Sequence, residues 1–246
     1  MAHKQPSNRQ KDISRVLRER NQQRIYKAQS KIGVPDLVRK NISPKAHWEN
    51  IYTTKQPTEV SWYKTRLDPS LKIISKLGLA PESPLIDIGA GASNLADDLL
   101  RQNFQDISVL DISSKALEIS KRRLGPDAMK VTWLEADITN AVLPKKHYDL
   151  WHDRAVFHFL TGANDKRKYV EVLKSSLKDT GHLVIATFNL NGPLKCSGLD
   201  IVRYSPETLS KELGGEFKLI ESFDEAHQTP FHTVQNFVYG WFEKSA

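Results

Sequence analysis

Residues 85–95, with the sequence LIDIGAGASNL, constrain the fold of this chain more than any other stretch. The run Leu85–Ile88 is short and mostly apolar, as expected of a buried strand, and a glycine-rich turn follows it directly. Glycine at positions 89 and 91 lets the backbone turn tightly and approach a ligand without a Cβ in the way. The helix that should follow presents its free N–H groups at the same place. The stretch therefore predicts a strand, a turn and a helix, with a ligand at the turn.

The rest of the chain repeats this pattern, because short apolar runs bounded by turn residues alternate with longer amphipathic segments. The predicted strands are residues 85–88, 107–110, 131–134, 148–152, 182–188, 217–223 and 233–242. The predicted helices are residues 70–78, 93–102, 113–124, 165–178 and 206–213. The last two strands are separated by a loop containing His227, Pro230 and His232, so we expect an antiparallel hairpin. The predicted fold class is α/β: a doubly wound, mostly parallel seven-stranded sheet with an antiparallel edge hairpin.

The positive charge of the chain is concentrated at its start. The net charge is +7 over 246 residues. Residues 1–40 hold 11 Lys or Arg and 3 Asp or Glu, a balance of 11 − 3 = +8, and residues 41–246 hold 25 and 26, a balance of 25 − 26 = −1. We therefore predict a basic, flexible or partly helical arm at residues 1–41 and one folded domain at residues 42–246. The arm is either a solvated tail, a targeting segment or a polyanion-binding segment.

Composition also limits the compartment and the cofactor type. No apolar run approaches the roughly 18 residues that cross a bilayer, and no secretory signal is evident, so no membrane partner is expected. The single cysteine, Cys196, cannot form an internal disulfide, and no Cys/His cluster has zinc-site spacing. We expect a cytoplasmic protein without a metal, with a mitochondrial location through the basic arm as the alternative.

Carboxylates follow three consecutive predicted strands. Asp111 lies 24 residues after Asp87, close to the offset of about 20 residues expected for a ribose-binding acid, and Asp137 closes the third strand. Open α/β sheets bind ligands at the carboxyl ends of their strands. A dinucleotide fingerprint would place a third glycine where this chain has Asn94, which disfavours a pyrophosphate ligand.

These residues resemble the motifs of the class I S-adenosylmethionine-dependent methyltransferases. Residues 87–91 match the family's glycine-rich motif, Asp111 its ribose acid and Asp137 its adenine-side motif. The resemblance covers about residues 45–242. Residues 47–52 and 61–63, HWENIY and SWY, are similar to the start of the subgroup that contains citrate-synthase and elongation-factor lysine methyltransferases and bacterial relatives.

The resemblance implies a Rossmann-like fold, a methyltransferase activity and S-adenosylmethionine as cofactor. The residues that it implies for cofactor binding are Trp62, Asp87, Gly89, Ala90, Gly91, Ser93, Asp111, Ile112, Asp137, Ile138 and His152.

The end of the fourth predicted strand is dense in ionisable side chains. Methyl transfer is an in-line displacement, so a protein needs to align donor and acceptor and to accept a proton. We predict His152, Asp153 and Arg154 as catalytic residues. His152 would be either a base or a hydrogen-bonding wall. Beyond the fifth strand, residues 188–199 form a predicted substrate lid, and the predicted acceptor-binding residues are Arg203, His232 and Gln235.

The absence of one sequence motif narrows the class of methyl acceptor. Base-methylating enzymes of this family carry an Asn/Asp-Pro-Pro-aromatic motif where this chain has residues 152–155, HDRA, so a nucleic-acid acceptor is disfavoured for the neutral domain. The acceptor is then a protein side chain, with lysine as one option, or a small metabolite. Two alternatives stay open: a catalytically silent methyltransferase-like binding module and an NAD-dependent oxidoreductase.

Overall fold

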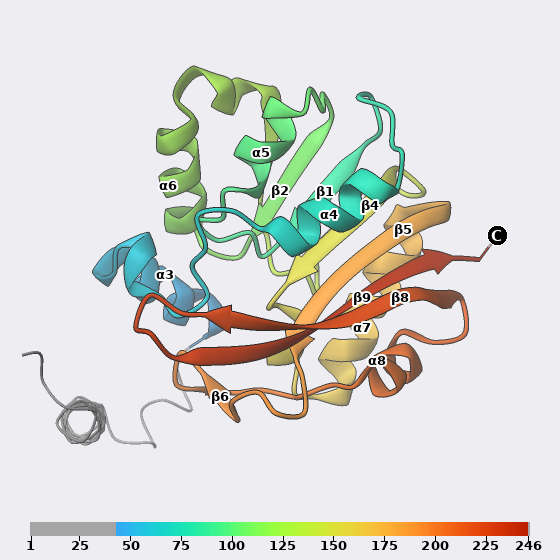
Figure 1. Ribbon diagram of the computed structural model, residues 1–246. Helices are drawn as coiled ribbons and strands as arrows, with labels where there is room; N and C mark the ends of the chain where they lie inside the picture. Colours follow the sequence, from blue (N-terminus) through green and yellow to red (C-terminus); the bar gives the residue numbers. More distant parts are fainter. Residues whose placement is uncertain (1–42, 246) are drawn as a thin grey trace, which may run out of the picture. The chain divides into compact units, whose positions relative to one another are not determined.

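A seven-stranded sheet forms the centre of the computed structural model, which describes residues 43–245 (Figure 1). The arm predicted for residues 1–41 lies outside the described residues. The strand order is β3-β2-β1-β4-β5-β9-β8. The strands are β1 (Leu85–Ile88), β2 (Ile107–Asp111), β3 (Val131–Glu135), β4 (Tyr148–Arg154), β5 (Leu177–Phe188), β8 (Phe217–Gln228) and β9 (Val234–Lys244). The first five are parallel, and β9 runs antiparallel to both β5 and β8. The predicted fold class is confirmed.

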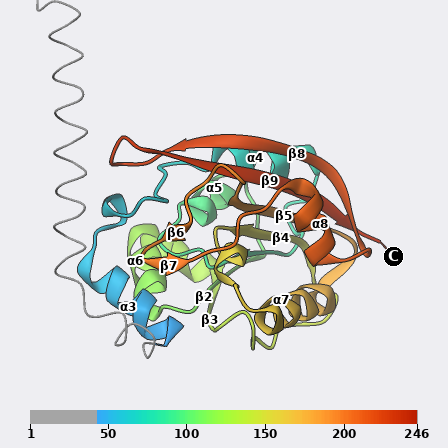
Figure 2. The same ribbon diagram turned by 90° about the horizontal axis from the view of Figure 1, so that it is seen from below.

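Helices cover both faces of the sheet. They are α3 (Pro44–Thr54), α4 (Asp68–Lys76), α5 (Leu95–Arg101), α6 (Ser114–Leu124), α7 (Ala163–Ser176) and α8 (Pro206–Leu213), with 3₁₀ turns η1 (Pro57–Glu59), η2 (Gly125–Lys130) and η3 (Phe157–Phe159). Figures 1 and 2 show α4 and α5 on one face and α7 and α8 on the other. This is the doubly wound arrangement, with a packed core on each side of the sheet.

The alternation of side chains along β4 decides which residues reach which face. Leu150 packs in the core formed with α4 and α5, and Trp151 packs in the core formed with α7 and α8. Because successive strand residues point to opposite faces, the next residue, His152, lies on the α4 side and Asp153 on the α7 side. The two predicted catalytic neighbours are therefore separated by the sheet.

Several strands run further than predicted; β5, for example, begins at Leu177 and not at residue 182. β4 ends at Arg154, which pairs with Ala186 of β5, and not at His152. β8 ends at Gln228, so His227 is a strand residue that pairs with Gln235. The prediction that His227 lies in the hairpin loop is wrong, because ladder pairing continues through residues 224–228 on the hairpin. The loop itself is only residues 229–233.

The segment predicted as a lid contains a small antiparallel ribbon, β6 (Lys195–Cys196) with β7 (Leu199–Asp200). Cys196 is buried there, and burial raises the pKa of its thiol to about 12. The reactive thiolate form is thus disfavoured at neutral pH. No helix within residues 43–245 is both long and apolar enough to cross a membrane.

Candidate functional site

The glycine-rich turn between β1 and α5 needs glycine at both positions. Gly89 and Gly91 have φ of +57° and +58°. A Cβ on Gly89 would lie 2.0 Å from Cγ2 of Val156, and one on Gly91 would lie 2.2 Å from Oη of Tyr52. Any side chain would clash as well as strain the backbone. The turn therefore holds the chain close to two neighbouring segments.

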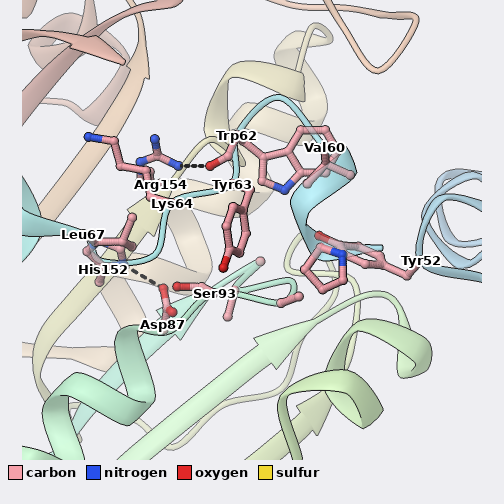
Figure 3. A pocket seen from close by; sticks show the side chains of 14 residues that line it. Tyr52, Val60, Trp62, Tyr63, Lys64, Leu67, Asp87, Ser93, His152 and Arg154 are labelled. Carbon is pink, nitrogen blue, oxygen red and sulfur yellow. Dashed lines mark hydrogen bonds and ion pairs between the residues drawn. The ribbon is translucent and has the colours of Figure 1, made fainter. Parts of the chain in front are cut away.

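A pocket open to solvent lies beside this turn at the carboxyl ends of β1 and β4 (Figure 3). It is lined by Tyr52, Pro57, Val60, Trp62, Tyr63, Lys64, Leu67, Asp87, Gly89, Ala90, Ala92, Ser93, His152 and Arg154. Six predicted cofactor-binding residues are among them: Trp62, Asp87, Gly89, Ala90, Ser93 and His152. Figure 3 shows the ring of Tyr63 pointing across the pocket toward Ser93.

His152 holds Asp87 at the floor of this pocket. The two residues are neighbours in the β1–β4 ladder, and His152 Nδ1 lies 2.6 Å from Asp87 Oδ1. His152 Nε2 lies 2.8 Å from Oγ of Ser70 on α4. Because the carboxylate can only accept, Nδ1 donates to it, and Nε2 of the neutral ring accepts from the Ser70 hydroxyl. Both ring nitrogens thus have partners, which fits the hydrogen-bonding wall better than the base.

Arg154 links the pocket to the hairpin. Its Nη1 donates to the carbonyl of Trp62 at 2.9 Å, and its Nε donates to Tyr239 Oη at 3.1 Å. The guanidinium also lies 4.8 Å from the ring centroid of Phe237. Its Nη2 is buried and has no hydrogen-bond partner among the described residues. One donor of this side chain is therefore left for another group.

Asp153 faces the opposite side of the sheet and supports the chain after β4. Its carboxylate accepts from Tyr169 Oη at 2.7 Å and from the backbone N–H groups of Val156 and Phe157 at 2.9 and 3.2 Å. It is fully buried, and burial raises its pKa to about 6 against these hydrogen bonds. Asp153 does not line the pocket and so does not join His152 and Arg154.

Asp111 lies under the glycine-rich turn. Its carboxylate accepts from Gly91 N at 2.7 Å and from Ser113 N at 2.8 Å. Burial raises its pKa to about 6 against these two hydrogen bonds. Tyr52 lies above the turn, and burial followed by the Asp111 charge raises the pKa of its phenol. Asp111 is thus next to the pocket but covered.

The remaining predicted cofactor residues lie further along the same sheet edge. Asp137 caps its own turn by accepting from Thr139 N and Oγ1 at 2.9 and 2.8 Å. Ile138 packs in the α7-side core. The main chain of Ala136 donates to Asp111 O, which joins the ends of β2 and β3. These residues and Ile112 do not line the pocket.

None of the three predicted acceptor-binding residues lines the pocket, and Gln235 contacts only the segment beside it. Its Nε2 donates to Ser61 Oγ at 3.2 Å, next to Trp62. Arg203 instead braces the lid segment by donating to the carbonyls of Leu190 and Gly192 at 2.6 and 3.3 Å. His232 is exposed in the hairpin loop.

Sequence reasoning did not identify the polar site residues Tyr52, Tyr63, Lys64 and Ser70, nor the apolar lining residues Pro57, Val60, Leu67 and Ala92. The first two lie in the HWENIY and SWY segments that carried the narrower resemblance, so a signal for them existed. Ser70 offers none, because only the packing of α4 against β4 brings its hydroxyl to His152.

The chain is similar in sequence to known methyltransferases. Residues 86–183, from β1 into β5, match the family model described as a methyltransferase domain. The mouse protein named "eEF1A lysine and N-terminal methyltransferase" is 27% identical over 108 residues, which is 44% of this chain but 15% of that protein. A bovine protein of the same name is matched over only 19% of its length. The zebrafish (Danio rerio) "EEF1A lysine methyltransferase 2" is 20% identical over 168 residues, 63% of this chain and 72% of that protein.

Solved structures share the fold. An S-adenosylmethionine-dependent methyltransferase from Anabaena variabilis superposes with a TM-score of 0.65 at 16% identity, covering 83% of this chain and 96% of that one. The 1,6-didemethyltoxoflavin-N1-methyltransferase of Burkholderia thailandensis gives a TM-score of 0.59 at 13% identity, covering 100% and 94%.

Proposed function

The chain carries a class I S-adenosylmethionine-dependent methyltransferase domain, and from that premise we propose that it transfers a methyl group to a side chain of a protein. The observation that carries this proposal is the pocket at the glycine-rich turn, where Asp87, His152, Trp62 and Tyr63 meet. It lies where open α/β sheets bind their ligands. The NAD-dependent and silent-module alternatives are not favoured.

The residues at this pocket fit the chemistry of the cofactor. S-adenosylmethionine supplies, when bound, a methyl group on a positively charged sulfur. The Asp87 carboxylate offers a counter-charge to a cationic ligand group, and the rings of Trp62 and Tyr63 offer faces to a cation. The Asp111 carboxylate still has lone pairs beyond its two backbone partners, so it can accept from ribose hydroxyls once a bound ligand displaces its cover at Tyr52.

His152 acts in this proposal by positioning Asp87. Its ring bridges β1 and α4 through Asp87 and Ser70. A carboxylate held from one side keeps its other lone pairs directed at the ligand. We therefore expect His152→Ala to weaken cofactor affinity at least as much as it slows turnover, and calorimetric titration beside steady-state kinetics measures both. A loss of turnover alone would instead support the base.

Lysine is the proposed acceptor residue, because the similar mouse and zebrafish proteins are named as lysine methyltransferases. A small metabolite is the second candidate. It is favoured by one observation: residues 57, 60, 62–64 and 67, which all lie before the start of α4, line the pocket together with the turn.

Labelled methyl transfer tests the proposal. The full chain is incubated with methyl-labelled S-adenosylmethionine and either the protein fraction or the low-molecular-mass fraction of a lysate. Label in protein, recovered as methyllysine after hydrolysis, is expected, and an Asp87→Asn variant should lose it. Label only in small molecules would establish the metabolite candidate, and absence of cofactor binding would overturn the methyltransferase proposal itself.

A further inference from the structure

One face of the β8–β9 hairpin carries polar side chains for which the cofactor pocket has no use. Glu225 and His227 of β8 lie two residues apart and so share a face, and Gln235 of β9 lies directly opposite His227. This hairpin face packs against the segment that lines the pocket: His227 Nε2 lies 2.7 Å from the carbonyl oxygen of Ser61, and Glu225 pairs with Lys64. The hairpin face and the pocket are therefore adjacent.

Buried polar atoms without partners gather here. Among the described residues, no hydrogen bond is made by Nη2 of Arg154, Oε2 of Glu225, Nδ1 of His227 or Oε1 of Gln235. Whichever way the Gln235 amide is turned, only one of its two ends bonds to Ser61. His227 is fully buried and Glu225 is 9% exposed. Because each such atom costs about 1–3 kcal/mol when left unpaired, a group of them beside a pocket indicates a missing partner.

The tautomer of His227 follows from its one hydrogen bond. The carbonyl of Ser61 can only accept, so Nε2 carries the proton and Nδ1 of the neutral ring is a lone-pair acceptor. Burial, and then the charge of Arg154, lowers the pKa of His227, which keeps the ring neutral. Nδ1 can thus accept a hydrogen bond, but no donor among the described residues bonds to it.

We propose that this hairpin face binds the methyl acceptor as a neutral amine, with His227 Nδ1 accepting one of its N–H groups; the inference rests on the proposed methyltransferase function. An amine offers N–H groups that can donate to the two acceptor atoms without partners, His227 Nδ1 and Glu225 Oε2. A carboxylate acceptor offers none and would be repelled by Glu225. Two cations, Arg154 and Lys64, face one carboxylate here, and this excess of positive charge disfavours the ammonium form.

The bound geometry suits the reaction. An amine that donates N–H to His227 keeps its lone pair free for the methyl carbon. The new N–C bond forms as the C–S bond breaks, the electron pair stays on sulfur, and the product is S-adenosylhomocysteine with a methylated ammonium. That ammonium loses its extra proton to solvent after release. His227 orients the nucleophile, and Arg154 Nη2 is left to donate to an oxygen of the same acceptor molecule.

Nitrogen NMR of the histidine rings in the full chain tests amine binding directly. The protein is saturated with S-adenosylhomocysteine and titrated with Nα-acetyl-lysine-N-methylamide or, in parallel, with the corresponding glutamate derivative. We expect the Nδ1 resonance of His227 to shift and saturate with the lysine probe alone. No shift, or an equal shift with the glutamate probe, would overturn the proposal.

A matched pair of variants provides the kinetic test. His227→Gln keeps a donor for the Ser61 carbonyl but replaces the ring acceptor at Nδ1 with an amide oxygen at a different place on the side chain, so kcat/KM for the lysine probe should fall about tenfold while cofactor affinity stays the same. His147→Gln is the control. His147 directly precedes β4, at the end of the strand away from Arg154 and the pocket, so this variant should change neither quantity. Unchanged kcat/KM in His227→Gln would eliminate the assignment.

Failure of the proposed function looks different from failure of this inference. If S-adenosylhomocysteine does not bind, as measured by calorimetry, the methyltransferase proposal fails. If it binds but the lysine probe leaves the His227 resonances unmoved, only the amine site fails.

Discussion

At the scale of single residues, neighbours in sequence have separate roles because the sheet divides them. His152 lies in the pocket, and Asp153 lies on the α7 side, where it holds Tyr169 and two backbone N–H groups. From the sequence we predicted both as catalytic, because nothing in a run of ionisable residues shows which face of the sheet each side chain lies on.

Replacing Asp153 should therefore affect stability more than ligand binding. Asp153→Ala leaves three donors, two of them buried, without an acceptor, so we expect a loss of roughly 1–3 kcal/mol in the free energy of unfolding, measured by urea denaturation. Cofactor affinity of the folded variant should change little. Asp149→Ala, four residues earlier on β4 in a partly exposed ion pair with Lys178, is the control and should cost less than about 1 kcal/mol. Equal losses in the two variants would contradict this account.

Asp111 gives a pH dependence whose sign can be stated. Its folded-state pKa is raised to about 6 by burial, so the carboxyl is largely protonated below pH 6 and ionised above it. Only the ionised form offers both oxygens as acceptors to ribose hydroxyls. Affinity for S-adenosylmethionine should be constant above pH 7 and about tenfold weaker one unit below the pKa.

Asp111→Asn is the control for this pH profile. It should bind more than about tenfold more weakly at pH 7.5 and lose most of the dependence, although Asp153, with a pKa also about 6, still titrates in both proteins. Unchanged affinity in the folded variant would remove Asp111 from the ribose site.

At the scale of elements, Glu49 is one of the side chains that hold α3 over the glycine-rich turn, beside the Lys45–Glu135 ion pair and the ring contacts of Trp48. The Glu49 carboxylate accepts from Ser114 N and Oγ at 2.7 and 3.0 Å, at the start of α6. An acid at a helix N-terminus satisfies free N–H groups and opposes the helix dipole. This contact keeps Tyr52, on the next turn of α3, above Gly91.

Loss of this contact should loosen the cover of the pocket. We expect Glu49→Ala to raise amide hydrogen exchange in α3 and to weaken cofactor affinity, while the exchange of β1 and β4 stays unchanged. Asn50→Ala, an exposed position on the same helix, should change neither measurement. If α3 exchange is the same in both variants, Glu49 does not hold the helix.

At the scale of the whole molecule, ligand binding should stabilise the fold in a way that identifies the cofactor. A ligand at about a hundred times its Kd adds about 2.7 kcal/mol to the free energy of unfolding. For a domain of this size that corresponds to about 5–10 °C in Tm. We expect this shift with S-adenosylmethionine and not with NAD, measured by differential scanning fluorimetry. A shift in Tm with NAD alone would instead support the oxidoreductase alternative.

Much of the fold was predictable because its signals are local. A short apolar run ends at a turn residue, and amphipathic spacing marks a helix, so the seven strands and five of the helices were identified before their arrangement was known. Element ends were less accurate: β8 continues to Gln228 because it pairs with β9, and that pairing is set across the ladder. The glycine-rich turn was likewise predictable, because both glycines have a positive φ, which is a local property of the backbone.

The sequence by itself determined the order of strands and helices, the turn at residues 89–91 and the acids Asp87 and Asp111 at strand ends. Only the tertiary structure decided which side chains meet. Ser70 reaches His152 because α4 packs on that face, and His227 reaches Ser61 because the edge hairpin folds back over residues 61–64. These two contacts join residues that lie 82 and 166 positions apart in the sequence. Such contacts depend on packing and on the twist of the sheet, which no local pattern encodes.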